Sequence, residues 1–210
     1  MNGVVVIDDK AFKDASFGKL GMWFFLIMDG LSFVAILIAA AYLRTNGAPW
    51  PAPGQVLNVP LTAFNTFVLL LSSYTMMNAF ESVRAGKQRQ FIAFLGWTLV
   101  LGIMFLAVQA YEYYNFIIGT PEVREHLASA GLGGDFFRPS SSIYAGCFYG
   151  ATGFHGLHVL SGVIFIIYVL AGALKGRFNQ GNHLRVETLT LFWHFVDLMW
   201  MLVFTVVYLL

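Results

Sequence analysis

Acidic and imidazole side chains lie within long apolar stretches of this sequence, where a charge is costly. They are Asp29, Glu81, Glu112, His155, His158, Glu187, His194 and Asp197. In a membrane interior such groups are rare, and they pair with one another, bind ions or take part in proton transfer. These residues are therefore the first candidates for proton handling, for metal binding or for contacts between helices.

Asp29 lies about 12 residues into the first apolar stretch, close to the predicted bilayer midplane. A carboxylate there costs on the order of 3 kcal/mol or more unless it is paired. With no lysine or arginine predicted near it, the sequence predicts a neutral carboxylic acid hydrogen-bonded to a neighbour such as Ser32. Such a buried carboxyl group is typical of a proton-handling site or of a polar contact between helices.

His155 and His158 are three residues apart and share one face of a helix. On the last apolar stretch, His194 and Asp197 lie on one polar stripe with Glu187 and Thr190. Imidazole suits iron, copper and zinc, so a metal or haem site is one interpretation, but this spacing alone is unspecific. We instead predict that the following residues form a polar network between helices, with no metal, cofactor or catalytic group in this chain: His155, His158, His194 and Asp197.

The three glutamates lie near the ends of the apolar stretches. We expect Glu81, Glu112 and Glu187 to reach headgroups or loop cations such as Arg84 and Arg185. Aromatic residues gather at the same borders, where amphipathic rings are favoured. We predict as interfacial anchors Trp50, Tyr111, Tyr113, Tyr114 and Phe116.

Composition identifies the class of protein to which these groups belong. Of 210 residues, 58% are hydrophobic, 17% are aromatic and only 11% are charged, whereas soluble domains carry about 25% charged residues. A water-soluble fold of this size could not bury so much apolar surface, and a formal net charge of +1 gives no basic field for phosphates. A cytosolic enzyme and a nucleic-acid-binding protein are therefore excluded, and the chain is predicted to be a membrane protein.

Five apolar stretches are long enough to cross a bilayer, since a spanning helix needs about 20 residues. They cover residues 17–43, 61–83, 91–118, 142–174 and 186–210. We predict an all-α membrane protein, a bundle of five transmembrane helices that forms a single integral-membrane domain over residues 1–210. The fourth stretch is long enough to require a tilt or a kink.

Lysine and arginine are distributed unevenly between the two sides of this arrangement. One side carries Lys10, Lys13, Lys19, Arg84, Lys87, Arg89, Lys175, Arg177 and Arg185, and the other carries Arg44, Arg124 and Arg138. Positive charges are enriched in cytoplasmic loops. The sequence therefore predicts a cytoplasmic N-terminus and a C-terminus outside, in the periplasm.

Two motifs resemble those of a known family. Residues 151–159 read Ala-Thr-Gly-Phe-His-Gly-Leu-His-Val and residues 192–200 read Phe-Trp-His-Phe-Val-Asp-Leu-Met-Trp. Both resemble subunit III of haem-copper oxidases, and so do Leu20-Gly21-Met22-Trp23 leading to Met28-Asp29, Asn65-Thr66, and Gln109-Ala110-Tyr111-Glu112-Tyr113-Tyr114. The resemblance covers residues 19–210. Most similar members have Glu after Ser where this chain has Met28-Asp29. The carboxyl group of Asp29 is therefore one methylene closer to the backbone than that of the family's glutamate.

The resemblance implies a non-catalytic subunit of a proton-pumping cytochrome c oxidase, in the short five-helix form of a bacterial inner membrane. Haem and copper are then expected in catalytic subunit I, beside which this chain would pack, with subunit II and other respiratory subunits as further partners. It also implies bound structural phospholipids and a contribution to proton uptake. His183 and Glu187, with Glu81 and Asp14, are predicted to collect protons on the cytoplasmic side and pass them to subunit I.

Three alternatives remain open at this stage. The chain could be subunit III of a quinol oxidase or of a nitric oxide reductase, because electrons do not pass through this subunit. It could be a small proton channel or transporter that uses Asp29, His155 and Asp197. It could also be a membrane haem protein, which would be coloured as a single purified chain.

Overall fold

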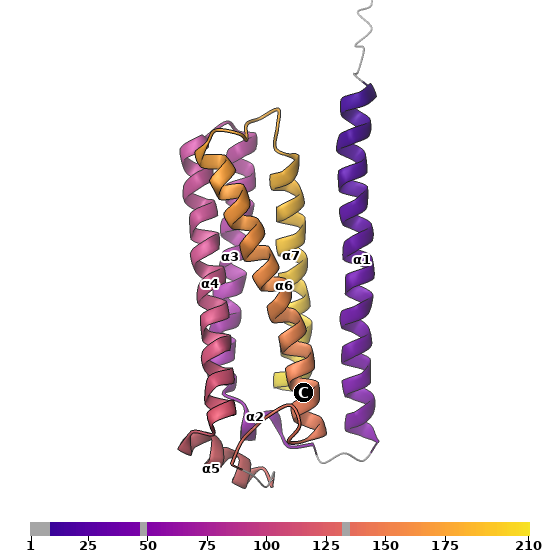
Figure 1. The fold of residues 1–210 in the computed structure, drawn as a ribbon, viewed down its shortest axis with the longest axis vertical. Coiled ribbons are helices and arrows are strands. Elements are labelled where there is room, and N and C mark those ends of the chain that lie inside the picture. The colour runs from indigo at the N-terminus through magenta and orange to yellow at the C-terminus, as the bar shows by residue number, and fades with distance from the viewer. Residues whose placement is uncertain (1–8, 47–49, 132–134) are drawn as a thin grey trace, which may run out of the picture.

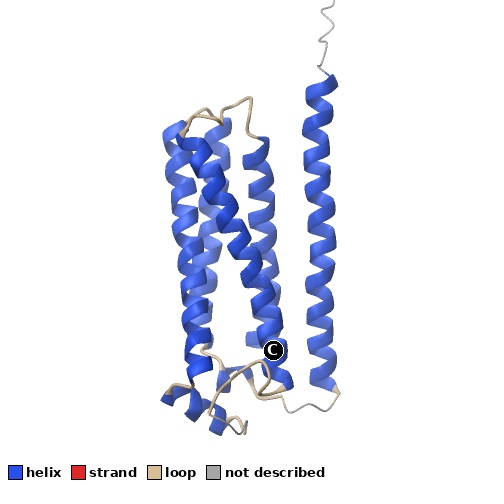
Figure 2. Cartoon of the chain, viewed as in Figure 1, coloured by secondary structure: helices blue, strands red, loops and turns tan. Residues whose placement is uncertain are grey.

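The computed structural model describes residues 9–46, 50–131 and 135–210, with side chains from Phe17 onward (Figure 1). Within these residues the chain consists of helices and connecting loops (Figure 2). In the last connecting loop, Asn179 and Asn182 form an isolated antiparallel bridge. The elements are α1 (Asp9–Thr45), α2 (Pro53–Val56), α3 (Val59–Arg84), α4 (Gln88–Ile118), α5 (Pro121–Ser129), α6 (Ile143–Leu174), α7 (Leu184–Phe204) and the π-helical turn η1 (Thr205–Leu209).

Five segments are long and apolar enough to cross a membrane, which confirms the predicted number of spans. They are Phe17–Thr45, Val59–Arg84, Gln88–Ile118, Ile143–Leu174 and Leu184–Leu209. Every bound lies within three residues of its prediction, and the chain is a multi-pass membrane protein. The short helices α2 and α5 were not predicted, although Pro121 in the first turn of α5 is a recognised helix-start signal.

Local sequence signals explain several helix ends. The Asn58 side chain accepts a hydrogen bond from the Leu61 N–H at 3.1 Å, and Ser142 Oγ accepts one from the Ala145 N–H at 3.0 Å. These caps satisfy backbone donors that have no partner inside the helix. At the C-terminal end of α4, Gly119 has a left-handed backbone with φ of 69°, a conformation that favours glycine.

The long helices form a group of four with a fifth helix at its edge. α3 packs most extensively against α4, α6 packs against α4 and α7, and α7 also packs against α3. α1 packs against α6 and α7, and α6 is inclined across its neighbours (Figure 1). The C-terminus lies at the end of the bundle that carries α2 and α5, opposite the start of α1.

Two tryptophans seven residues apart on α7 fill the centre of the four-helix group. Trp193 and Trp200 are buried, and each donates its indole N–H to α3: to Ser72 Oγ and to Thr66 Oγ1, both at 2.9 Å. A buried indole N–H requires such a partner. The hydroxyls on α3 and the rings on α7 therefore fix how these two helices face each other.

Candidate functional site

Asp29 forms a contact between α1 and α6 within the membrane span. Its Oδ1 lies 3.1 Å from Nε2 of His158, and both side chains are largely buried. The second oxygen, Oδ2, has no hydrogen-bond partner among the described residues. Ser32, the neighbour considered from sequence, donates instead to the Met28 carbonyl oxygen at 3.2 Å. The partner of the mid-membrane acid is therefore a histidine from another helix.

The second ring nitrogen of His158 is bound within its own helix. Its Nδ1 lies 2.7 Å from the Phe154 carbonyl oxygen, which only accepts, so Nδ1 donates the hydrogen of that bond. This bond fixes the orientation of the ring and directs Nε2 toward Asp29. One side-chain hydrogen bond thus joins α1 to α6 at this level.

Two further contacts hold α1 against the rest of the chain. The buried Phe33 ring packs against Phe154 and His158, with ring centroids 4.7 and 5.2 Å apart. Nearer the start of α1, Lys19 Nζ lies 2.7 Å from Glu187 Oε1 of α7. The polar pair of Asp29 and His158 thus lies between an aromatic contact and an ion pair.

His155, one turn before His158, is fully buried among aromatic rings. Its ring lies at 34° to Trp200 with centroids 4.7 Å apart, and Phe105 meets it edge-on at 5.7 Å. Neither ring nitrogen has a hydrogen-bond partner among the described residues. In this environment His155 contributes an aromatic packing surface.

His194 and Asp197 lie on α7 but make separate contacts. His194 Nδ1 is bonded to the Thr190 carbonyl oxygen of its own helix at 2.7 Å. Asp197 is buried, and its Oδ1 has no partner among the described residues. The observed hydrogen bonds therefore do not join His155, His158, His194 and Asp197 into one network between α6 and α7. The reason is the rotation of each helix, which turns His158 toward α1.

Glu112 occupies a position that differs from the expectation of a headgroup contact. It is 8% exposed, and its Oε2 accepts a hydrogen bond from the Tyr208 hydroxyl at 3.0 Å, while Oε1 has no partner among the described residues. Tyr208 belongs to η1, which brings the end of the chain against α4. Burial against η1 therefore withdraws Glu112 from the membrane surface.

A second polar contact on α4 was missed by the sequence reasoning. Tyr113, expected as an interfacial anchor, has its hydroxyl 2.6 Å from Thr152 Oγ1, and Gln109 Nε2 donates to the Thr152 carbonyl oxygen at 2.8 Å. Tyr111 and Tyr114 are exposed, as expected of anchors. The sequence does carry a signal for a polar contact here, because the spacing of Gln109, Glu112 and Tyr113 places their side chains on one face of the helix.

The remaining sequence-predicted groups lie at the end where α3 finishes and α7 begins. Glu187 binds Lys19, and Glu81 lies 3.4 Å from Arg84. The His183 ring lies 6.2 Å from the Phe80 ring, between centroids, and its Nδ1 has no partner among the described residues. The Asp14 side chain lies outside the described residues.

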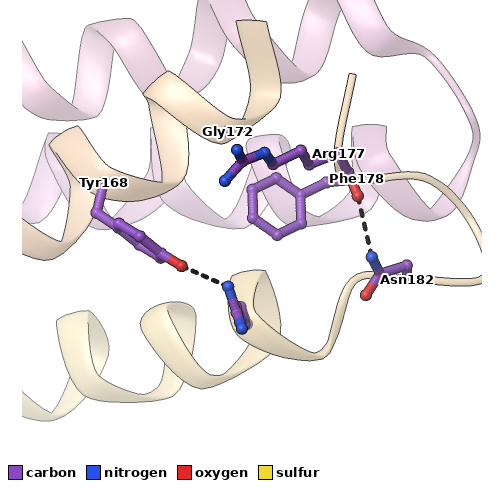
Figure 3. A pocket seen from close by; sticks show the side chains of 6 residues that line it. Tyr168, Gly172, Arg177, Phe178 and Asn182 are labelled. Carbon is purple, nitrogen blue, oxygen red and sulfur yellow. Dashed lines mark hydrogen bonds between the residues drawn. The ribbon is translucent and has the colours of Figure 1, made fainter. Parts of the chain in front are cut away.

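Two arginines, Arg177 and Arg185, are among the residues that line a cavity of about 310 Å³ at the α6–α7 connection (Figure 3). Arg185 donates a hydrogen bond to the Tyr168 hydroxyl, and Asn182 Nδ2 donates to the Arg177 carbonyl oxygen at 3.0 Å. No described carboxylate forms an ion pair with either arginine. Positive charge is thus concentrated at the end of the bundle where α7 begins.

The family model described as cytochrome c oxidase subunit III matches residues 10–121 and 133–210. The chain belongs to this family. The resemblance drawn from the two histidine motifs is confirmed.

Relatives of this subunit III carry the names of two kinds of oxidase. The cytochrome bo(3) ubiquinol oxidase subunit 3 of Pseudomonas aeruginosa is 33% identical over 202 residues, which cover 96% of this chain and 89% of that protein. The cytochrome c oxidase subunit 3 of Thermostichus vulcanus is 29% identical over 209 residues, covering 99% and 94%. The probable cytochrome c oxidase subunit 3 of Rickettsia bellii is 37% identical over 222 aligned positions, covering 97% and 73%.

As a member of the subunit III family, the chain is a non-catalytic part of an oxidoreductase complex. A metal site requires several ligands that converge on one point. Within the part of the chain that the structure describes, no group of three His, Cys, Asp or Glu side chains does so. The observed contacts of the subunit III histidines are instead with an acid, backbone carbonyls and aromatic rings.

Proposed function

We propose that this chain is subunit III of a proton-pumping haem-copper oxidase that accepts electrons from cytochrome c in a bacterial inner membrane. The observation that carries this proposal is the family match over two segments that together span nearly the whole chain. It favours a subunit over an independent proton channel. The haem and copper belong to the partner subunit I, with subunit II and other respiratory subunits completing the assembly.

A quinol oxidase is the second candidate for the whole complex. The relative in Pseudomonas aeruginosa is named as a ubiquinol oxidase subunit and is 33% identical to this chain. The same scaffold serves either donor, because no electron-carrying group is assigned to it. The choice between cytochrome c and quinol therefore depends on the partner subunits.

We propose that the chain stabilises the catalytic subunit, binds lipids and supports proton uptake. Large apolar faces on α1, α4 and α6 are left for lipid and for neighbouring subunits, with structural phospholipids among their contacts. The basic end around Arg177 and Arg185 supports a cytoplasmic N-terminus and a periplasmic C-terminus. The paired acid of α1, Asp29, contributes to holding α1 in place through its contact with His158 of α6.

The first test is a pull-down of the tagged chain in mild detergent, with a reduced-minus-oxidised spectrum of the eluate. We expect haem absorption together with a larger membrane subunit. Oxidation of reduced cytochrome c rather than of quinol by this eluate separates the two candidates. A colourless chain recovered alone from membranes that contain an active oxidase would contradict the proposal.

We further propose that His183 and Glu187, with Glu81 and Asp14, collect protons for subunit I. Changing His183→Ala and Glu187→Gln together is expected to slow proton uptake by the complex at alkaline pH, where bulk protons are scarce. The matched control changes the exposed His126 and Glu122 near the opposite end of the bundle, His126→Ala with Glu122→Gln. Equal uptake by both double variants and the unchanged complex would remove this role.

A further inference from the structure

Hydrogen bonds hold one wall of the cavity at the α6–α7 connection. The Arg177 N–H donates to the Gly172 carbonyl oxygen at 3.0 Å, and Asn182 Nδ2 donates to the Arg177 carbonyl oxygen at 3.0 Å. Asn179 Oδ1 accepts a hydrogen bond from the Asn182 N–H, also at 3.0 Å. Arg177 is therefore presented from a backbone that is bonded both to α6 and to the residues just before α7.

The cavity is short, and an aromatic ring fills its side next to α6. It follows one turn of α6 from Tyr168 to Gly172, which is about 6 Å at 1.5 Å per residue. Half of a hydrocarbon core of about 30 Å is about 15 Å, so this turn is too short to hold an acyl chain. The buried Phe178 ring packs on Gly172, where a Cβ atom would come within 2.6 Å of it (Figure 3). A volume of about 310 Å³ is instead typical of a small site for a water-soluble molecule.

Two positive charges at the cavity have no acidic partner. Arg177 and Arg185 are the charged residues of its described lining, and neither forms an ion pair with a described carboxylate. Arg185 donates to the Tyr168 hydroxyl, and its guanidinium carbon lies 5.8 Å from the centroid of that ring. This neutral phenol orients the guanidinium group but leaves its charge in place. Glu187, two residues further along α7, is bound to Lys19.

The start of α7 adds positive potential to that of the arginines. Asn182 and Arg185 both line the cavity and lie on either side of Leu184, the first residue of α7. The His183 side chain makes no capping hydrogen bond to the first turn of the helix. The N–H groups of a first helical turn have no partner inside the helix, and they favour anions. The electrostatics of the cavity therefore suit a ligand with more than one negative charge.

We propose that this cavity binds the phosphate groups of a water-soluble anion. Arg177 and Arg185 pair with the phosphate oxygens, because the planar donors of a guanidinium group match phosphate geometry. An anion with two phosphate groups satisfies both arginines and joins the α6–α7 connection to the start of α7. The site lies at the end of the bundle that we propose to face the cytoplasm, where phosphate-bearing metabolites are dissolved.

The experiment measures binding of pyrophosphate by isothermal titration calorimetry, to the purified chain and to its oxidase complex. Both are kept in a neutral detergent and a phosphate-free buffer. Arg177→Gln and Arg185→Gln are each expected to weaken binding about tenfold, as the loss of a charged hydrogen bond does. Lys175→Gln is the matched control and is expected to change the affinity little. It removes the same charge from the same connection, but Lys175 is exposed and does not line the cavity.

Three results would overturn the proposal. The first is an absence of pyrophosphate binding to the unchanged complex, and the second is an equal loss of affinity in Arg177→Gln and Lys175→Gln. The third comes from mass spectrometry of the same preparations. A phospholipid that stays on the unchanged chain and is missing from Arg177→Gln would show that a lipid headgroup, and not a soluble anion, occupies the cavity.

Discussion

Gly162→Val is expected to destabilise the purified chain in detergent by about 2 to 3 kcal/mol, as overpacking of a filled core does. A Cβ atom at Gly162 of α6 would come within 2.8 Å of the Trp193 ring. A Cβ atom at Gly102 of α4 would also lie 2.8 Å from that ring, so the ring is enclosed from both helices. Trp193 cannot easily withdraw, because its indole N–H is bonded to Ser72. The free energy of unfolding is measured by titration with a denaturing detergent.

The control for this change is Gly150→Val on the same helix. Apart from the adjoining residues and backbone of α6 itself, no atom lies within 4 Å of a Cβ built at Gly150, so added bulk meets open space there. Valine also has a higher intrinsic helix propensity than glycine, which makes a small gain in stability the expected result. Equal losses for Gly162→Val and Gly150→Val would show that the Trp193 contact does not limit the packing of α4, α6 and α7.

The second large effect is expected when one partner of the Asp29–His158 pair is removed. In His158→Leu neither oxygen of Asp29 has a partner among the described residues, and an unpaired acid in the bilayer costs on the order of 3 kcal/mol. Asp29→Asn is expected to cost about 1 kcal/mol or less, because an amide can still donate to or accept from the imidazole. The same unfolding titration gives both values.

A double variant tests whether the pair acts as a unit. Asp29→Leu combined with His158→Leu removes both polar groups and is expected to be less damaging than His158→Leu alone. Accessibility of α1 to a protease reports whether the lost free energy comes from undocking that helix. If Asp29→Asn proved as damaging as His158→Leu, the fold would require a carboxyl group at position 29, and an amide that makes the same polar contact with His158 would not be sufficient.

The helical spans were predictable because their signal is local. A run of about 20 apolar residues must cross the bilayer as a helix whatever its neighbours do, since no water is present to satisfy its backbone. All five spans accordingly agree with the predictions to within three residues. The short helices α2 and α5 were missed because a few polar residues near the membrane border carry no comparable signal.

The polar contacts could be predicted only in part from the sequence. The sequence identified Asp29 and His158 as groups within the spans, but it offered Ser32 as a candidate partner of Asp29 and placed His158 in a network with α7. Helical spacing shows which side chains share a face, but it does not show which neighbouring helix that face meets. The pairing across 129 residues follows from the docking of α1 on α6.

From residue types and spacing alone, this chain is determined to be a membrane protein of five helical spans with acids and imidazoles inside them. The length of an apolar segment and the cost of a charge within it are properties of that segment alone, so both can be predicted from the sequence without knowing how the helices pack. Only the tertiary structure decides that Asp29 meets His158, that Tyr208 buries Glu112 across 96 residues, and that Arg177 and Arg185 line one cavity. Those features depend on which helices adjoin and how each is rotated, and packing between distant segments sets both.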